Sequence, residues 1–205
     1  MESLHFGAGK IGRGFIGALL AGSGFRVTFA DAQRGVVEAI NRSGGYCVHA
    51  VGEQSSVLRV EGVSAVLADS EQCVERFVEA DLVTTAVSMG ALPAVAPIVA
   101  RGIAARCRAG VDRPLNIICC ENGIRATSLF KTMVAEYLDD SLQRWSDEHI
   151  GFADCCVDRI VPIVTLDNPL DVAVEPHYEW CVDATAIKGE ITLPTDVHLV
   201  KDIDA

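Results

Sequence analysis

The chain has 205 residues, of which 50% are hydrophobic and 22% charged, and its formal net charge is −11. This composition is typical of a globular protein with a sizeable core. The acidic balance disfavours nucleic acid and anionic membrane surfaces as partners, because both are bound by clustered lysine and arginine. The sequence contains no apolar run of membrane-spanning length and does not open on a signal peptide, so we expect a cytoplasmic location.

The eight cysteines form no Cys-x-x-Cys pair. The doublets Cys119-Cys120 and Cys155-Cys156 lie in apolar, strand-like runs, where neighbouring side chains face opposite ways. We therefore expect reduced cysteines that pack as small core side chains. The histidines show no spacing typical of a metal site, so no bound metal is expected and a zinc alcohol dehydrogenase finds no support. These histidines are His5, His49, His149, His177 and His198.

A glycine-rich turn near the N-terminus carries the strongest functional signal. Residues 3–6 predict a short buried strand, and the apolar spacing over residues 11–20 predicts a helix. Gly7, Gly9 and Gly12 fall between strand and helix, where they permit a tight turn, close approach of a pyrophosphate, and close packing of helix on strand. The helix N-terminus would attract the anion through its unpaired N–H groups.

A second strand, residues 25–30, ends at Asp31, which stands 19 residues after Gly12. A carboxylate at this place can bind the ribose hydroxyls of a dinucleotide. A glycine triplet alone is equally compatible with an ordinary turn. The combination of strand, triplet, helix, second strand and terminal aspartate favours a dinucleotide-binding unit.

Strand-like and helix-like segments alternate through the first two-thirds of the chain, which predicts a Rossmann-type α/β fold with a doubly wound, mostly parallel sheet. Two short strands, 46–51 and 57–66, are separated by the polar residues 53–56 and are expected to form a small β insertion beside that sheet. The other expected elements are, in chain order, helix 33–42, strand 82–87, helix 92–108, strand 115–120, helix 126–137, a segment before Gly151, strand 155–161, short strands 172–174 and 180–182, and a polar, turn-rich tail 188–205.

Ligands of an open parallel sheet bind at the carboxyl ends of its strands. At the end of strand 82–87, Thr85 and Ala86 are small enough to pass close to a cofactor. After strand 115–120, the amide of Asn122 could donate to a carbonyl oxygen that gains negative charge during hydride transfer. A turn or helix-capping role for Asn122 is an equally good interpretation.

The segment around Asp158 and Arg159 forms a third such end. Charged side chains within an apolar strand are costly unless they are paired or functional, so an ion pair between these two is the expected structural role. Lys10, Arg13 and Arg159 are the cations expected to meet a phosphate in this acidic chain.

Several segments together resemble the mannitol dehydrogenase family, and the similarity spans about the first 190 residues. The resemblance to the branch of that family that acts on mannitol 1-phosphate is carried by residues 4–17, 28–31, 81–87, 114–118 and 120–122. Residues 150–162 are similar to the signature of the wider family.

This resemblance implies a zinc-independent oxidoreductase that interconverts mannitol 1-phosphate and fructose 6-phosphate with NAD as cofactor. It implies that Asn122 stabilises the oxyanion, and that Asp158 and Arg159 shape the substrate side. The cofactor contacts that we expect are Phe6, Gly7, Ala8, Gly9, Lys10, Ile11, Gly12, Arg13, Asp31, Thr85, Ala86 and Asn122.

The chain departs from the family pattern in a few places. Lys10 stands where an asparagine is usual, Ser88-Met89 where Gly-Pro is common, and Gly123 follows Glu121-Asn122. Family members also carry a second, mostly helical domain, whose first helix supplies a lysine general base; neither Lys188 nor Lys201 sits in the matching motif.

From this difference in length we expect residues 1–195 to be the NAD-binding domain and residues 196–205 to begin a linker to a C-terminal domain that is absent. The chain alone would then be inactive. The face around Asn122 would be unusually apolar, and it would self-associate or bind the separately supplied domain. Two alternatives stay open: a hexuronate or free-polyol dehydrogenase of the same family, and a non-catalytic NAD(H)-sensing module.

Overall fold

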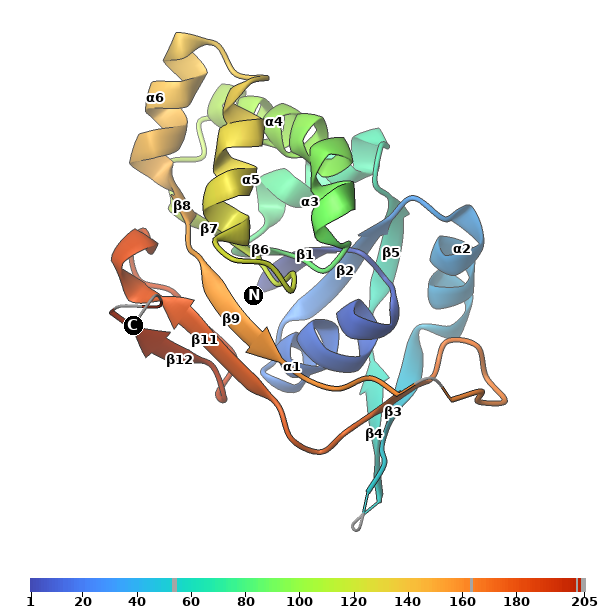
Figure 1. Ribbon diagram of the computed structural model, residues 1–205. Coiled ribbons are helices and arrows are strands. Elements are labelled where there is room, and N and C mark those ends of the chain that lie inside the picture. Colours follow the sequence, from blue (N-terminus) through green and yellow to red (C-terminus); the bar gives the residue numbers. More distant parts are fainter. Residues whose placement is uncertain (53–54, 163, 202, 204–205) are drawn as a thin grey trace.

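The computed structural model describes residues 1–52, 55–162, 164–201 and 203. Its centre is a six-stranded parallel sheet in the order β5-β2-β1-β6-β7-β8 (Figure 1). Numbered along the chain, this is the strand order 3-2-1-4-5-6 of the Rossmann fold, so the predicted fold class is confirmed. The strands are β1 (Glu2–Phe6), β2 (Arg26–Asp31), β5 (Ser64–Leu67), β6 (Leu82–Thr85), β7 (Leu115–Cys119) and β8 (Ile150–Phe152).

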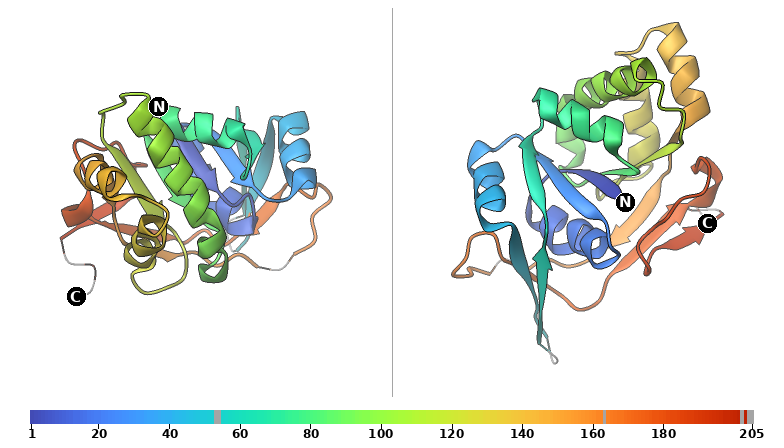
Figure 2. Two further views of the ribbon diagram at one scale, coloured as in Figure 1. Left: turned by 90° about the horizontal axis from the view of Figure 1, so that it is seen from above. Right: turned by 180° about the vertical axis from the view of Figure 1, so that it is seen from behind.

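Alternation of side chains along the strands divides the core into two layers, one on each face of the sheet. In β1, for example, Leu4 and Phe6 belong to one apolar cluster, whereas His5 faces the other side and its ring meets Phe29 of β2 edge to face. Figure 2 shows helices on both faces of the sheet. One face carries α3 (Glu71–Glu79), α4 (Leu92–Arg108), α5 (Ala126–Ala135) and α6 (Asp140–His149). The other carries α1 (Gly17–Gly22) and α2 (Arg34–Ser43).

Local sequence signals account for most of these helices. The predicted bounds of α4 are reproduced, with Pro93 in its first turn, where its missing N–H is not needed. Helix α3 was not anticipated, although Ser70 caps it by accepting a hydrogen bond from the Cys73 N–H at 3.2 Å. The described residues also contain two short 3-10 turns, η2 (Met89–Ala91) and η3 (Ala184–Ala186).

The helix after the glycine turn opens with an irregular segment, η1 (Gly12–Ile16), which has π-helical hydrogen bonding. The Gly17 N–H reaches back to the Gly12 carbonyl, five residues earlier, before the chain continues as α1. The periodicity predicted a regular helix here. Such π segments are frequent at functional sites, and this one immediately follows the predicted phosphate-binding turn.

The predicted β insertion exists as a second sheet. Strands β3 (Gly45–Ala50) and β4 (Ser56–Glu61) pair antiparallel, and β10 (Val172–Val174) joins β3 in parallel. The expected single strand 57–66 is wrong, because Gly62 has φ +71° and ends β4, so that the next residues form β5 at the edge of the main sheet. Of the polar residues 53–56 expected between the strands, 53 and 54 lie outside the described residues.

A third sheet contains β9 (Cys155–Asp158), β11 (Glu179–Asp183) and β12 (His198–Val200) in the order β12-β11-β9. Strand β9 is shorter than the predicted strand 155–161, and it pairs antiparallel with β11 rather than joining the main sheet. The tail expected to be turn-rich includes β12, and its residues 202, 204 and 205 lie outside the described part.

All eight cysteines are free, but only Cys73, Cys119 and Cys120 are buried as expected, and four others are half-buried. Burial raises the pKa of the Cys73 thiol to about 12, which suits a packing role, but Cys156 is exposed rather than in the core. Within the described ranges, no helix combines the length and apolar character needed to cross a bilayer.

Candidate functional site

A cleft of about 720 Å³ lies at the carboxyl ends of β1, β6 and β7, where the strand order reverses. Ligands of this sheet type bind at such a switch point. One wall is the glycine turn with the helix that follows it, and the opposite wall is β9. The lining residues are Gly9, Lys10, Ile11, Phe15, Ala86, Val87, Ser88, Cys120, Glu121, Asn122, Cys156, Val157, Asp158, Arg159 and Glu179.

The glycine turn meets the steric demands of a bound pyrophosphate. Gly7 has φ +98°, and a Cβ there would stand 2.4 Å from the Ala86 carbonyl oxygen. A Cβ on Gly12 would stand 1.9 Å from the Gly7 carbonyl oxygen. A Cβ on Gly9 would meet no described atom within 4 Å, and Gly9 lines the cleft. The turn therefore exposes bare backbone beside a helix N-terminus, which fits the pyrophosphate of a dinucleotide.

Asp31 lies at the end of β2 beside this turn. One carboxylate oxygen accepts a hydrogen bond from the Ala8 N–H at 2.7 Å, and the other accepts one from the Gln33 N–H at 2.8 Å. These two bonds hold the half-exposed carboxylate at the edge of the turn. Its expected contact with ribose hydroxyls stays a prediction that this position favours.

Arg13 differs from the expectation that it meets a phosphate. Its guanidinium is buried and donates to the Leu170 carbonyl at 2.9 Å, to the Pro169 carbonyl at 3.4 Å, and to the Ala8 carbonyl. Its backbone N–H donates to the Gly9 carbonyl at 2.9 Å. Arg13 therefore braces the glycine turn from behind. The exposed Lys10 is the cation that the turn presents to the cleft.

His5 lies beneath the same turn, a role that sequence reasoning missed. Its Nδ1 is 2.7 Å from the Thr84 hydroxyl, while Nε2 is buried and has no hydrogen-bond partner among the described residues. Burial lowers the pKa of His5 to about 3, so the imidazole is neutral at physiological pH. The only early signal was a histidine inside an apolar strand.

Glu121 connects the loops that form the floor of the cleft. The Thr85 hydroxyl lies 2.8 Å from both Glu121 carboxylate oxygens, and the Val87 N–H donates to one of them at 3.0 Å. Burial raises the pKa of Glu121 above its usual value, although these hydrogen bonds oppose the shift. Glu121 thus positions the loop after β6, and Thr85, expected as a cofactor contact, is buried against it.

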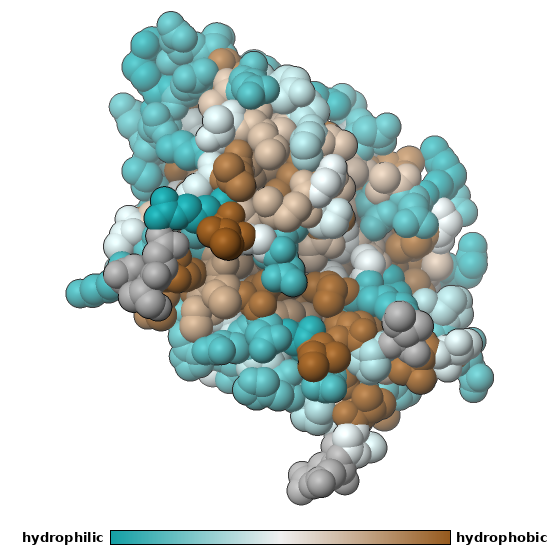
Figure 3. Space-filling view, viewed as in Figure 1, coloured by the Kyte–Doolittle hydropathy of each residue, from teal (hydrophilic) through white to brown (hydrophobic). Residues whose placement is uncertain are grey.

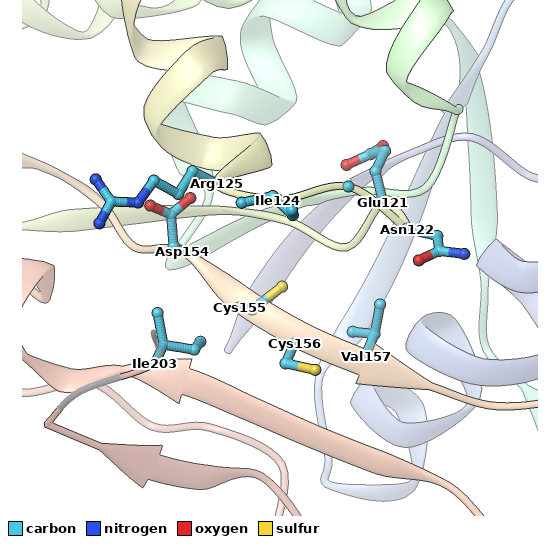
Figure 4. A pocket seen from close by; sticks show the side chains of 10 residues that line it. Glu121, Asn122, Ile124, Arg125, Asp154, Cys155, Cys156, Val157 and Ile203 are labelled. Atoms are coloured by element: carbon cyan, nitrogen blue, oxygen red, sulfur yellow. The ribbon is translucent and has the colours of Figure 1, made fainter. Parts of the chain in front are cut away.

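Asn122 is exposed and lines both the cleft and a neighbouring cavity of about 540 Å³. Figure 4 shows Asn122 and Glu121 at one end of that cavity and Arg125 with Asp154 at the other. The helix-capping interpretation is not supported, because Arg125 occupies the N-cap position of α5. The Asn122 amide therefore projects where a ligand can reach it.

The expected ion pair between Asp158 and Arg159 is wrong: no such pair occurs within the described ranges. Asp158 is exposed at the end of β9. Arg159 donates to the Glu175 carbonyl and to the Gly14 carbonyl, both at 3.2 Å, and its guanidinium lies 4.8 Å from the centre of the Tyr178 ring. Arg159 thereby fastens β9 to η1, and it also lines the cleft.

Two departures from the family pattern contact each other. A Cβ on Gly123 would stand 2.5 Å from the Met89 sulfur, so a small residue at 123 accommodates methionine at 89. Ser88 adopts φ 97° and ψ 151°, a backbone region that favours glycine. Glycine, the residue that is common in the family at this place, would suit this conformation. Ser88 lines the cleft, and its conformation carries strain of about 1–3 kcal/mol.

The face around the cleft bears exposed apolar side chains. Ile124 is 87% exposed, Ile160 is 56% exposed and Ile11 is 36% exposed. Figure 3 shows hydrophobic surface gathered over the middle of this face, bordered by hydrophilic residues. Apolar side chains are thus exposed here, whereas an unusually apolar face and self-association through it stay predictions.

Of the expected cofactor residues, the structure places Gly9, Lys10, Ile11, Ala86 and Asn122 around the cleft. The expected substrate-side residues Asp158 and Arg159 form part of its opposite wall. Buried residues support the turn from within, and these are Phe6, Gly7, Ala8 and Gly12.

Solved structures with the same fold are remote in sequence. An octopine dehydrogenase in complex with NADH and L-arginine has a TM-score of 0.63 at 12% identity, and the match covers 98% of this chain and 49% of that one. A 2-dehydropantoate 2-reductase from Methylococcus capsulatus has a TM-score of 0.52 at 15% identity, and the match covers 89% of this chain and 48% of that one. The chain therefore spans about half the length of these proteins.

The family assignment comes from the sequence match. Residues 1–194 match the family described as "Mannitol dehydrogenase Rossmann domain". The match covers most of the chain, and it agrees with the strand order and the glycine turn described above. This chain belongs to the mannitol dehydrogenase family and contains its Rossmann domain, the dinucleotide-binding fold of these oxidoreductases.

Proposed function

We propose that this chain binds NAD(H) and serves an oxidoreductase that interconverts mannitol 1-phosphate and fructose 6-phosphate. The observation that carries the cofactor half is the glycine turn, whose Gly9 offers open backbone to the cleft. The family match supports the class of reaction, and the NADH complex of the octopine dehydrogenase shows that a similar fold accepts this cofactor.

Within this proposal, a bound NAD(H) would supply or accept the hydride, and the proton at the substrate oxygen would be exchanged with the lysine that the family resemblance assigns to the second domain. The backbone at Gly9 and the first N–H groups of the helix bind the pyrophosphate. The Asn122 amide donates to the substrate oxygen as negative charge develops, in a cleft that the two walls partly shield from water. Glu121 is a positioning residue, because its hydrogen bonds with Thr85 and Val87 hold the loop after β6 in place.

Asp31 supports NADH rather than NADPH, since its carboxylate can accept bonds from ribose hydroxyls and repels a 2′-phosphate. Calorimetric titration of the chain with both cofactors tests this assignment. We expect the chain to bind NADH at least about tenfold more tightly than NADPH. Asp31→Ala should weaken the binding of NADH and reduce the difference between the two affinities. Equal or tighter binding of NADPH would contradict it.

The resemblance of residues 4–17 to the branch that acts on mannitol 1-phosphate supports a phosphorylated substrate, and the exposed Lys10 that lines the cleft is compatible with a phosphate in a chain of net charge −11. Rates of NADH consumption with fructose 6-phosphate, fructose and fructuronate, measured on the natural protein, separate the proposal from its alternatives. Fastest turnover of fructose 6-phosphate is expected. A preference for fructose would indicate a free-polyol enzyme, and a preference for fructuronate a hexuronate enzyme.

The role of Asn122 has its own test. In the natural protein, Asn122→Ala should lower kcat by about 10²–10³ while leaving the affinity for NADH nearly unchanged, because an oxyanion donor acts mainly in the transition state. Full turnover in this variant would remove the proposed role.

A further inference from the structure

Three side chains that can bind a transition metal converge away from the cleft, in the second sheet. Cys47 and His49 stand two residues apart in β3, so they share one face of the strand. Asp171 immediately precedes β10, which pairs with β3. One ligand atom from each residue lies within 4.8 Å of the others.

The Asp171 carboxylate holds one oxygen with two hydrogen bonds and turns the other toward its partner, the His49 ring. Its Oδ1 accepts hydrogen bonds from the Cys47 N–H and from the Asn168 amide, both at 2.8 Å. Its Oδ2 lies 3.4 Å from His49 Nε2. A tetrahedral zinc ion with bonds of about 2.0–2.1 Å separates two such ligands by roughly 3.3–3.4 Å. Hydrogen bonds that fix the second oxygen of a ligating carboxylate are a regular part of metal sites.

The donor set and its charge indicate which metal fits. Sulfur, imidazole nitrogen and carboxylate oxygen together suit zinc and its neighbours, whereas calcium and magnesium prefer oxygen ligands. A thiolate and a carboxylate balance the two positive charges of the ion. Arg59, which stands opposite Cys47 in β4, is paired with Glu61, and its guanidinium also contacts the Cys47 side chain.

We propose that Cys47, His49 and Asp171 form a binding site for one divalent metal ion of the zinc class, with a fourth coordination position open to water. The three residues are partly buried. The histidine spacing predicted no metal, because the third ligand is 122 residues away from His49 in the sequence.

The proposed site is connected to the glycine turn. Residues Pro169 and Leu170, which directly precede Asp171, accept the hydrogen bonds of the Arg13 guanidinium. Arg13 in turn donates to the carbonyl of Ala8 in the turn. A metal that holds Asp171 against β3 therefore stabilises the segment that braces the cofactor-binding backbone, and it closes a long loop of the chain.

Cobalt(II) is the probe for this site, because it occupies zinc sites and reports their geometry. We expect the chelator-treated chain to bind one equivalent, with the visible bands of tetrahedral cobalt and a near-ultraviolet thiolate-to-cobalt charge-transfer band; zinc should displace it. Cys47→Ser should abolish the charge-transfer band, and His49→Gln should weaken cobalt binding at least about tenfold. Cys181→Ser is the matched control, because this half-buried cysteine lies in the third sheet, and binding should be unchanged.

Thermal melts separate loss of binding from loss of folding. With chelator present, Cys47→Ser should melt as the wild type does, whereas saturating zinc should raise only the wild-type melting temperature, by about 5 °C or more. Absence of stoichiometric cobalt binding in the wild type overturns the proposal, even if a variant fails to fold. So does a charge-transfer band that survives Cys47→Ser or disappears in Cys181→Ser.

Discussion

The two walls of the cleft differ in what holds them in place. The glycine-turn wall depends on backbone contacts so close that Gly7 and Gly12 have no room for a Cβ. The β9 wall is paired with β11 and is fastened to η1 by a side chain, Arg159, which reaches the carbonyls of Gly14 and Glu175 and the ring of Tyr178. Where close backbone contacts leave no room for a Cβ, almost no substitution is tolerated. Where a long side chain makes the contacts, substitutions can weaken them gradually.

This difference matches the tasks that we propose for the two walls. The pyrophosphate of a dinucleotide is a constant feature, and a rigid backbone cradle suits it. Substrates vary between members of a family, and a wall held by side-chain contacts can be remodelled without disturbing the cofactor turn. The variants below test this comparison, from the largest expected effect to the smallest.

Gly12→Ala should affect the first wall most strongly. The new Cβ would stand 1.9 Å from the Gly7 carbonyl oxygen and 2.8 Å from His5 Nε2. We expect the free energy of unfolding to fall by at least about 3 kcal/mol and NADH binding to be lost, as measured by urea denaturation and calorimetry.

Gly35→Ala in α2 is the matched control, since its Cβ would meet no described atom within 4 Å. It should stabilise the protein by about 0.5–1 kcal/mol, because alanine is the better helix residue. A Gly12→Ala protein with wild-type stability and NADH affinity would refute the steric account of this wall.

Acidic pH should lower the free energy of unfolding through His5, which lies beneath the glycine turn of the first wall. Its pKa is about 3 in the folded chain and 6.5 in the unfolded chain, so between these values only the unfolded chain binds the proton. Stability should therefore fall as the pH decreases below about 6.5, by up to about 1.4 kcal/mol per pH unit, with no contribution from His5 above that range.

Urea denaturation at pH 7 and pH 5 measures this slope. His5→Asn should flatten it, whereas His177→Asn should leave it unchanged, because His177 is exposed. An identical slope in His5→Asn and the wild type would show that other groups cause the acid sensitivity.

Arg159→Lys tests the second wall. Lysine keeps the charge but loses the forked hydrogen bonds and most of the stacking on Tyr178, so we expect a loss of about 1–2 kcal/mol of stability. NADH affinity should change less than about threefold, because Arg159 reaches only η1, while the turn itself is held by close backbone contacts and by Arg13. The exposed Arg34→Lys is the control, with an expected change within about 0.5 kcal/mol. Loss of NADH binding in Arg159→Lys would mean that the two walls are coupled.

Ser88→Gly should give the smallest effect and the opposite sign. Glycine adopts φ 97° without the strain that serine bears, so stability should rise by about 1 kcal/mol, read from the thermal midpoint. Ser56→Gly, in the extended backbone of β4, should instead lower stability by about 0.5–1 kcal/mol. A destabilised Ser88→Gly protein would argue against strain at this position.

Local patterns in the sequence anticipated much of the fold and the centre of the site. The strand β1, the glycine turn, Asp31 and the whole of α4 follow from periodicity and turn chemistry within short stretches of chain. The carboxyl-end rule located Ala86 and Asn122, which line the cleft. The break between two strands at Gly62 was not predicted, because a run of strand-forming residues does not show which of them takes a left-handed conformation.

The amino-acid sequence by itself thus determined the type of fold and the place of the cofactor turn, because both depend on spacing among near neighbours. Only the tertiary structure decided which partners the polar side chains have. Arg13 binds a carbonyl 157 residues away, Arg159 binds one 145 residues away, and Cys47 meets Asp171 across 124 residues. The partner of a guanidinium, thiol or carboxylate is the group that the folded chain brings within about 3 Å of it. The periodicity of a short stretch of sequence carries no information about such distant neighbours.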